Sequence, residues 1–275
     1  MTVDAHLHLW DLEKVAYPWL TDALAPINRT FAFAEVEPQL RAEGVDGAVL
    51  VQAANSVEDS EAMFAVAASS PLVAGVVAWV DLLDPAATAA QLETWSAHPG
   101  FVGVRHLIHD EPDADWLARD AVRRSLAVVA VHGIAFDVIG VLPRHLELAV
   151  SLAEEQPELR IVVDHLGTPP AGSASSAAER EPWASLMTAL AAHPNVSTKL
   201  SGLTTIGDHL QPYADHALDA FGASRVLFGG DWPVSTLAGT YAETTAVARA
   251  LTAGLSEQER TDVFGGAARR AYRLG

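Results

Sequence analysis

The sequence predicts a single (β/α)8 (TIM) barrel over residues 1–275. The length of 275 residues is close to the roughly 250 residues usual for this fold. Short apolar runs alternate with amphipathic stretches, which is the pattern of parallel βαβ units. The runs are apolar on both faces, as expected for strands that are covered by helices. A doubly wound open sheet is the alternative, but it would usually carry a glycine-rich turn after the first strand, where this chain has His-Leu-His.

The first half of the chain supplies four strand–helix units. Continuous apolar runs predict strands over residues 2–7, 47–53, 73–80 and 102–107. Amphipathic stretches predict helices over residues 34–43, 57–68, 86–97 and 116–130. Gly44 ends the first of these helices. Asp84 caps the third helix, and Pro85 suits its first turn.

The second half repeats this pattern with four more units. Its apolar runs predict strands over residues 133–138, 160–166, 196–200 and 225–228. Helices are expected over residues 143–155, 183–192, 210–221, 241–251 and 256–270. Pro143 suits the first turn of the first of them.

Three connections are expected to set specificity, because binding residues concentrate on loops above a rigid scaffold. Residues 10–33 contain Tyr17, Pro18 and Trp19, and these aromatic residues indicate a packed lid. Residues 109–115 form an acidic loop after the fourth strand. Residues 169–178 are rich in Pro, Gly, Ser and Ala, which predicts a loop over one face.

The composition excludes several classes of function. The chain has 17 Lys and Arg against 35 Asp and Glu, a net charge of -18, which disfavours binding to nucleic acid and to anionic membranes. No apolar run reaches the ~18 residues of a membrane span, and polar residues stand where a signal peptide would be apolar. The absence of cysteine excludes disulfides and thiolate chemistry. We expect a soluble cytoplasmic protein that binds a small molecule, and the sequence does not indicate an oligomeric state.

The first predicted strand ends in His6-Leu7-His8. Side chains two residues apart share a face of a strand, so both imidazoles and Asp4 are expected on one face. Two imidazoles at a strand end are suited to metal binding or proton transfer. The pair alone is equally consistent with two structural histidines, because the pattern is short.

The other predicted strands also end in polar residues, at the edge where a barrel has its active site. These residues are Gln52, Arg105, His106, Asp137, Asp164, His165, Lys199 and Asp231. Asp231 is the strongest candidate, because the two preceding glycines allow a sharp turn that brings the carboxylate inward. The alternative role for Arg105 is structural, as one half of a buried ion pair with an acidic side chain. Lys199 is either a positioning cation or half of an interior ion pair.

Strand alternation separates neighbouring candidates onto opposite faces. His106 should therefore face away from Arg105, which predicts a structural role for His106. Of Asp164 and His165, only one should reach the pore; we assign His165 to it and Asp164 to a loop cap. The remaining candidates are treated as surface, structural or core residues: His98, His109, His193, His209, His216, Trp79 and Trp232. Trp10 is also typical of a core, but it is kept as a substrate contact because it follows His8 closely.

With these motifs placed, the chain resembles the amidohydrolase superfamily, in particular its branch of fuconolactonase-, rhamnonolactonase- and pyrone-dicarboxylate-lactonase-like hydrolases. The segments that carry the resemblance are DAHLHLW (4–10), GVRHLI (103–108), FDV (136–138), VVDHLG (162–167), TKLSGL (198–203) and FGGDWPV (228–234). The resemblance implies a distorted (β/α)8 barrel. It also implies that His6, His8, His165 and Asp231 surround the reacting centre.

The chain departs from the two-metal pattern of many superfamily members. Those members carry a carboxylated lysine on the fourth strand and a histidine on each of the next two. Here the three strands offer Arg105, Asp137 and His165. The resemblance therefore leaves two possibilities: a single Zn²⁺ or other divalent ion on His6, His8, His165 and Asp231, or a metal-independent site.

The resemblance to this branch implies a hydrolase that opens a sugar lactone by attack of water. Asp231 is the expected general base and then acid, and His165 the second catalytic residue. The expected substrate contacts are Arg105, which can grip a carboxylate or hydroxyls, together with Gln52, Asp137, Lys199 and Trp10. Two alternatives are a metal-dependent decarboxylase of an aromatic or unsaturated acid on the same fold, and a non-catalytic barrel that binds sugar acids.

Overall fold

The computed structural model describes residues 1–170, 176–207 and 209–275, and its eight strands form one sheet in sequence order. Each strand pairs in parallel with the next one along the chain. The strands are β1 (Val3–Leu7), β2 (Gly47–Val51), β3 (Val73–Ala78), β4 (Phe101–His106), β5 (Ala135–Val138), β6 (Arg160–Val163), β7 (Val196–Leu200) and β8 (Val226–Phe228).

The last strand returns to the first and nearly closes the barrel. Leu7 and Trp232 form a parallel bridge beyond the end of β8. The amide of His8 donates to the carbonyl oxygen of Trp232 at 2.7 Å, and the amide of Asp231 donates to the carbonyl oxygen of His6 at 2.7 Å. The predicted (β/α)8 barrel is confirmed.

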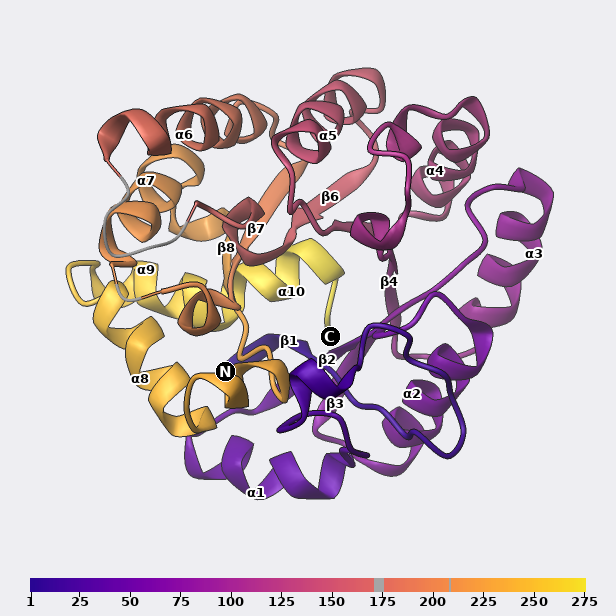
Figure 1. Cartoon of the computed structure of the whole chain (residues 1–275), viewed down its shortest axis with the longest axis horizontal. Coiled ribbons are helices and arrows are strands. Elements are labelled where there is room, and N and C mark those ends of the chain that lie inside the picture. Colours follow the sequence, from indigo (N-terminus) through magenta and orange to yellow (C-terminus); the bar gives the residue numbers. More distant parts are fainter. Residues whose placement is uncertain (171–175, 208) are drawn as a thin grey trace.

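Most of the helices surround the strands, and the last helix lies near the centre of the view (Figure 1). They are α1 (Phe33–Ala42), α2 (Val57–Ser69), α3 (Pro85–Ser96), α4 (Asp120–His132), α5 (Pro143–Glu155), α6 (Ala177–Ala191), α7 (Gln211–Phe221), α8 (Tyr241–Leu251), α9 (Glu257–Thr261) and α10 (Ala267–Tyr272). Most begin and end within a few residues of the predicted limits. Among the described residues, no helix is long and apolar enough to cross a bilayer.

Three helix predictions need correction. The helix predicted from residue 183 begins at Ala177, because Ser176 and Glu179 form a capping box. The stretch predicted as the start of α4 is a separate 3-10 turn, Trp116–Ala118. The helix predicted over 256–270 is interrupted by a π segment, Asp262–Gly266, in which Gly265 lies too close to the backbone of Met1 to carry a Cβ atom. The predicted loop over 169–178 lies partly outside the described residues.

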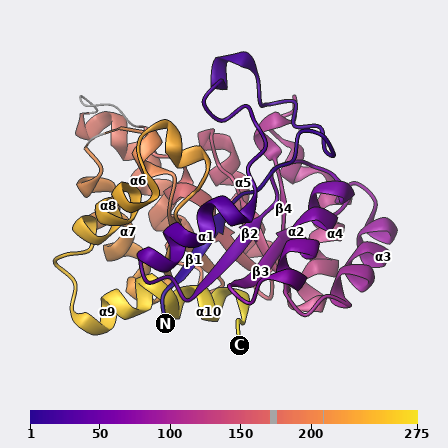
Figure 2. The same cartoon turned by 90° about the horizontal axis from the view of Figure 1, so that it is seen from below.

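The two ends of the barrel differ. At one end, α10 packs against interior residues of the strands, including Val3, Val49 and Val77. Both termini lie at this end, and the segment between β1 and α1 rises from the opposite end (Figure 2). That opposite end is where the strands finish, and the polar residues identified in the sequence gather there.

Candidate active site

A cavity of about 180 Å³ opens where the strands end. Its wall combines residues from the strand ends with residues from the loops above them. They are His8, Trp19, Ala53, Arg105, Leu107, His109, Ile139, His165, Asp231 and Val234. Four of the residues predicted from the sequence, His8, Arg105, His165 and Asp231, are therefore brought to one cavity.

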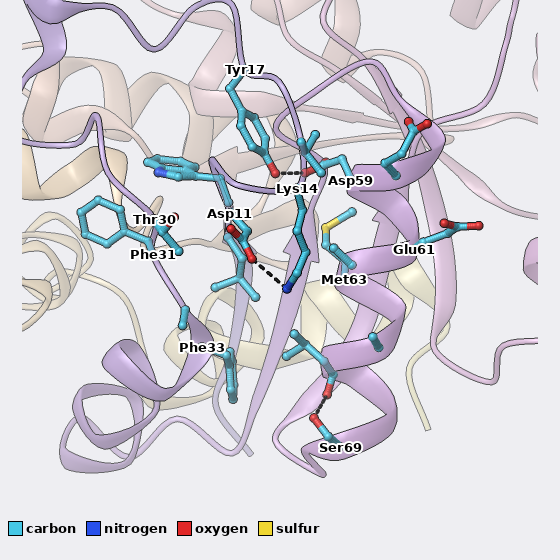
Figure 3. A pocket seen from close by; sticks show the side chains of 18 residues that line it. Asp11, Lys14, Tyr17, Thr30, Phe31, Phe33, Asp59, Glu61, Met63 and Ser69 are labelled. Carbon is cyan, nitrogen blue, oxygen red and sulfur yellow. Dashed lines mark hydrogen bonds and ion pairs between the residues drawn. The ribbon is translucent and has the colours of Figure 1, made fainter.

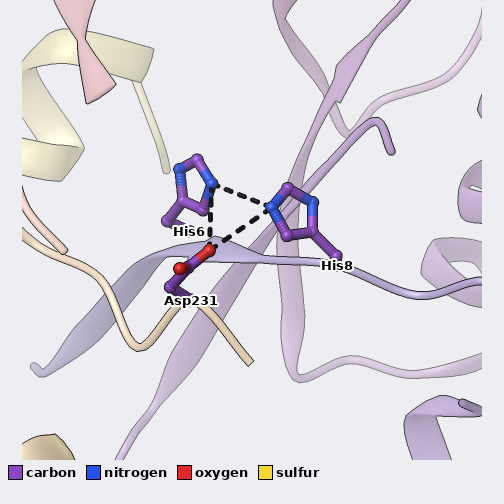
Figure 4. Close-up of side chains that lie close together, drawn as sticks. All are labelled: His6, His8 and Asp231. Atoms are coloured by element: carbon purple, nitrogen blue, oxygen red, sulfur yellow. Dashed lines mark hydrogen bonds and ion pairs between the residues drawn. The ribbon is translucent and has the colours of Figure 1, made fainter. Parts of the chain in front are cut away.

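His6, His8 and Asp231 converge at one edge of this cavity (Figure 4). The Nε2 atoms of His6 and His8 lie 3.0 Å apart. Asp231 Oδ1 lies 3.7 Å from Nε2 of His6 and 3.5 Å from Nε2 of His8. The two imidazoles thus share a face, as the sequence predicts, and the late carboxylate meets them there.

The backbone holds this group together. Asp231 adopts φ 52°, in the left-handed region, and its amide bonds to the carbonyl oxygen of His6. Asp4 accepts hydrogen bonds from the amides of His6 (3.0 Å) and Gly230 (2.9 Å) and from the hydroxyl of Tyr241 (2.7 Å). A Cβ atom on residue 230 would lie 2.5 Å from Asp4 Oδ2, so glycine is required for this close approach.

Asp4 does not share the face of the two histidines, contrary to the prediction. The register between β1 and β2 shifts between Asp4 and Leu7. The carboxylate of Asp4 reaches Tyr241 of α8, whereas His6 contacts Lys199 of β7 inside the barrel. Burial raises the pKa of Asp4 to about 6, while its hydrogen bonds oppose that rise.

The donor set of His6, His8 and Asp231 suits a divalent ion. Nδ1 of His8 lies 2.7 Å from the carbonyl oxygen of Val51, which can only accept, so Nδ1 carries the proton and Nε2 has its lone pair free. Bonds of ~2.0–2.1 Å in a tetrahedral zinc site place ligand atoms about 3.3 Å apart, close to the separations of 3.0, 3.5 and 3.7 Å found here. His165 belongs to a second group, with His6 and Asp164.

A buried charge network forms the floor beneath His6. Lys199 Nζ lies 2.9 Å from His6 Nδ1, 2.8 Å from Asp164 Oδ1 and 2.5 Å from Asp137 Oδ2. Arg105 Nη1 donates to Asp164 Oδ2 at 3.0 Å. Burial and the Lys199 ammonium group hold the pKa of His6 well below its usual range, so this imidazole is neutral at neutral pH.

The pKa values of the two carboxylates in the network, Asp164 and Asp137, are shifted in opposite directions. Burial would raise the pKa of Asp164, but Lys199, His6 and Arg105 together hold it well below its usual range. Burial raises the pKa of Asp137 to about 6, against the opposing effect of Lys199. Asp164 is therefore the carboxylate that is ionised at neutral pH between Lys199 and Arg105.

Asp164 and His165 both face the site, which corrects the prediction that only one would. β6 ends at Val163, and His165 and Leu166 adopt left-handed φ values of 54° and 51°. Strand alternation no longer applies there. His165 Nδ1 lies 2.9 Å from the hydroxyl oxygen of Ser201, and Gly202 packs so closely that a Cβ atom would lie 2.5 Å from the same nitrogen.

Four predicted substrate contacts do not line the cavity. Asp137 and Lys199 are fully buried in the network below it. Gln52 is also buried; its main-chain carbonyl oxygen accepts from Arg105, and its side-chain Nε2 donates to the main-chain carbonyl oxygen of Arg105 at 3.2 Å. Trp10 packs against Trp19 and donates to the carbonyl oxygen of Arg29 at 2.6 Å.

His106 has the structural surroundings that alternation predicts. Its Nδ1 accepts from the indole of Trp79 at 3.1 Å, and its Nε2 lies 2.8 Å from Glu111 Oε1. Its ring stacks on Trp116 with centroids 4.1 Å apart. These contacts hold the loop that follows β4.

The sequence reasoning missed two residues of the cavity wall, Trp19 and His109. Trp19 was part of the predicted lid without an assigned role, and His109 was treated as a surface or structural residue. His109 stands on a 3-10 turn, Ile108–Asp110, directly after β4. Its place within three residues of a strand end was the signal that could have identified it.

Comparison with known proteins identifies the family. The chain matches the family model described as Amidohydrolase over residues 3–274. An L-fucono-1,5-lactonase from Burkholderia ambifaria is 38% identical over 282 residues, covering 99% of this chain and 95% of the relative. An L-fucono-1,5-lactonase from Burkholderia multivorans is 31% identical over 292 residues, covering 100% and 96%.

Solved structures agree with the fold. An amidohydrolase from Burkholderia multivorans with bound HEPES superimposes with a TM-score of 0.93 at 29% identity over 100% of both chains. Another crystal form with bound zinc gives a TM-score of 0.90, again at 29% identity over 100% of both chains. A 2,6-dihydroxybenzoate decarboxylase from Rhizobium shares the fold alone, with a TM-score of 0.68 at 17% identity over 99% of this chain and 98% of the decarboxylase. The family model and the two lactonases together show that the chain belongs to the amidohydrolase family.

Proposed function

We propose that this chain is a lactonase that opens the ring ester of a sugar 1,5-lactone and releases the open-chain sugar acid. The observation that carries the proposal is the convergence of Asp231 with His6 and His8 at the edge of the strand-end cavity. The names of the two Burkholderia relatives support L-fucono-1,5-lactone or a close analogue as the substrate. The decarboxylase alternative is supported by a shared fold only.

The size and the lining of the cavity suit a single polar ring. Its volume of about 180 Å³ is below the roughly 300–1,000 Å³ of pockets for drug-sized ligands. Arg105, His109 and His165 offer polar groups to hydroxyls, while Trp19 and Ile139 offer apolar surface. A deoxysugar lactone is complementary to this lining, because it carries both hydroxyls and an apolar methyl group.

Asp231 is the proposed proton carrier. A water oxygen attacks the lactone carbonyl carbon, and the Asp231 carboxylate takes one proton from that water. The bond from the carbonyl carbon to the ring oxygen then breaks, and Asp231 returns the proton to the departing ring oxygen. The product is the hydroxy acid, and Asp231 is again a carboxylate.

Arg105 and His165 are proposed to bind the substrate and stabilise the negative charge that develops on the carbonyl oxygen. Both line the cavity. Within the described chain, Arg105 Nε is buried and has no hydrogen-bond partner. Asp164 fixes the guanidinium group from below, and Ser201 fixes the His165 ring.

His6, His8 and Asp231 are the residues proposed to hold a divalent ion. Such an ion, when bound, polarises a carbonyl and lowers the pKa of water. Gln52, Asp137 and Lys199 are then positioning residues, because they hold Arg105 and His6 from beneath the cavity.

A panel of sugar lactones tests the proposal. The purified protein is incubated with L-fucono-, L-rhamnono- and galactonolactones at neutral pH, with and without chelator, and acid release is followed with a pH indicator. We expect acid release well above spontaneous hydrolysis for at least one lactone. Release of carbon dioxide from 2,6-dihydroxybenzoate is measured in parallel. Acid release from none of the sugar lactones would overturn the proposal.

A further inference from the structure

The segment between Trp10 and Phe31, residues 11–30, forms a lid over one side of the cavity. Trp10 and Phe31 close its base, since each amide donates to the other residue's carbonyl oxygen, at 3.3 and 2.9 Å. The lid places Trp19 in the cavity wall. Its position therefore decides how closely the indole approaches a bound ring.

Two side-chain hydrogen bonds tie the outer part of the lid to the barrel. The hydroxyl of Tyr17 donates to Asp59 Oδ1 at 2.7 Å. The indole Nε1 of Trp19 donates to the carbonyl oxygen of Ala53 at 2.7 Å. Ala53 lies in the turn that leads from β2 into α2, and Asp59 lies in the first turn of α2.

Asp59 links these two attachments. Its second oxygen, Oδ2, accepts from the amides of Ala53 (2.8 Å) and Ala54 (3.3 Å). The same carboxylate therefore holds Tyr17 and fixes the peptide whose carbonyl oxygen holds Trp19. Asp59 is 1% exposed and Tyr17 is 6% exposed, so the hydrogen bond between them does not compete freely with solvent.

The packing beneath the lid is incomplete, which gives these hydrogen bonds their importance. A second cavity of about 640 Å³ lies between the lid and α2 (Figure 3). Asp11, Lys14, Tyr17 and Asp59 line it. Where this cavity lies, side chains lack contacts that would otherwise fix the lid. The hydrogen bonds therefore act together with the buried apolar residues of the lid to set its position.

We propose that Tyr17 and Asp59 are positioning residues that hold Trp19 against the lactone ring and so determine which lactone this chain prefers. This inference rests on the proposed lactonase function. Neither residue touches the substrate, since neither lines the strand-end cavity. Their effect passes through the lid and through the Ala53 peptide to the indole.

The variants Tyr17→Phe and Asp59→Asn test this role. A hydrogen bond to a charged group contributes about 1.5–3 kcal/mol, which corresponds to about tenfold or more in an equilibrium constant. We expect KM for the preferred lactone to rise about tenfold, kcat to change less than about threefold, and the preference between lactones to shrink. Asp59→Asn should have the larger effect, because Asp59 also accepts from the amides of Ala53 and Ala54, and Tyr17→Phe leaves those hydrogen bonds in place.

Lys14→Gln is the matched control. Lys14 lies in the same lid, but its side chain is 75% exposed and pairs with Asp11 at 2.8 Å. We expect its KM, kcat and lactone preference to equal those of the wild type. A Tyr17→Phe variant that lowers kcat and the melting temperature together, with an unchanged preference between lactones, would show a merely structural role and overturn the proposal.

Hydrogen exchange separates this inference from the lactonase proposal. In the free protein, we expect amides of residues 11–30 to exchange at least about tenfold faster in Tyr17→Phe than in the wild type, while those of β4 and β5 are unchanged. Unchanged exchange in the lid would overturn the anchoring even if lactones are hydrolysed. Faster exchange in a protein that hydrolyses no lactone would reject the proposed function and, with it, the role in lactone preference, but not the anchoring.

Discussion

The amide of Asp231 donates a hydrogen bond of 2.7 Å to the carbonyl oxygen of His6. This contact joins the end of the last strand to the end of the first. It holds Asp231 at φ 52°, a conformation that few residues with a Cβ atom adopt. The backbone, rather than side-chain packing alone, therefore sets the distance between the carboxylate and the two imidazoles.

Asp231→Asn should remove the proton carrier without changing the shape of the site. We expect kcat/KM for the preferred lactone to fall by roughly 10²–10⁴, the usual contribution of general acid–base catalysis, with little change in the melting temperature. Asp219→Asn, on the exposed face of α7, should have wild-type activity. A fall of less than about tenfold would show that another group carries the proton.

His8→Ala should abolish tight metal binding, because it removes a ligand nitrogen whose lone pair is fixed by the bond from Nδ1 to Val51. Replacing a residue that only hydrogen-bonds to a metal ligand usually weakens metal binding by roughly 10–100-fold. We expect the Kd for Zn²⁺ to rise by more than this, because His8 is itself a proposed ligand. His209→Ala, at an exposed position, is the control. Metal content after dialysis gives the result without an activity assay, and equal zinc content in both variants would contradict the assignment.

Gly202→Ala should disturb His165. The new Cβ atom would lie 2.5 Å from His165 Nδ1, and the residue would have to keep φ +67°, which costs about 1–2 kcal/mol for a residue with a Cβ atom. We expect a lower melting temperature and a loss of lactone hydrolysis of at least about tenfold. Gly254→Ala is the matched control, since nothing lies within 4 Å of its Cβ position. Equal behaviour of the two variants would refute the contact.

Asp59 should make the stability of the protein depend on pH. Burial raises its pKa from 3.8 to about 6, although Tyr17 and two backbone amides oppose the rise. The folded state therefore binds more protons than the unfolded state between these values, and the free energy of unfolding falls as pH rises through this window.

Asp59→Asn cannot titrate, so it isolates this effect. We expect the free energy of unfolding of the wild type, relative to the variant, to decrease by up to about 3 kcal/mol between about pH 4 and pH 7. Urea unfolding at a series of pH values measures the difference. A difference that is constant with pH would show that Asp59 keeps the same pKa in both states.

The sequence was sufficient where a residue's position follows from periodicity. The eight apolar runs predicted the strands, and the glycines before Asp231 predicted a carboxylate turned inward. His6 and His8 share a face because they stand two apart at the end of β1. Strand alternation also predicted that His106 faces away from Arg105.

The sequence was insufficient where the chain leaves regular structure. Left-handed conformations at His165 and Leu166 bring Asp164 and His165 to the same site. The register shift in β1 separates Asp4 from His6. Lys199 and Asp137 form an ion pair below the cavity, which depends on how far the side chains reach across the strands. His109 and Trp19 come from turns whose paths depend on tertiary contacts.

The seam between β1 and β8 also bears on synthesis of the protein. The histidine pair leaves the ribosome well before its carboxylate partner and the strand that orients it. A nascent chain that ends before β8 contains most of the strands but lacks Asp231, so its candidate active site is incomplete. Premature termination anywhere before the Asp-Trp-Pro turn would thus yield an inert fragment with an open sheet edge, a target for quality control rather than a partly active enzyme.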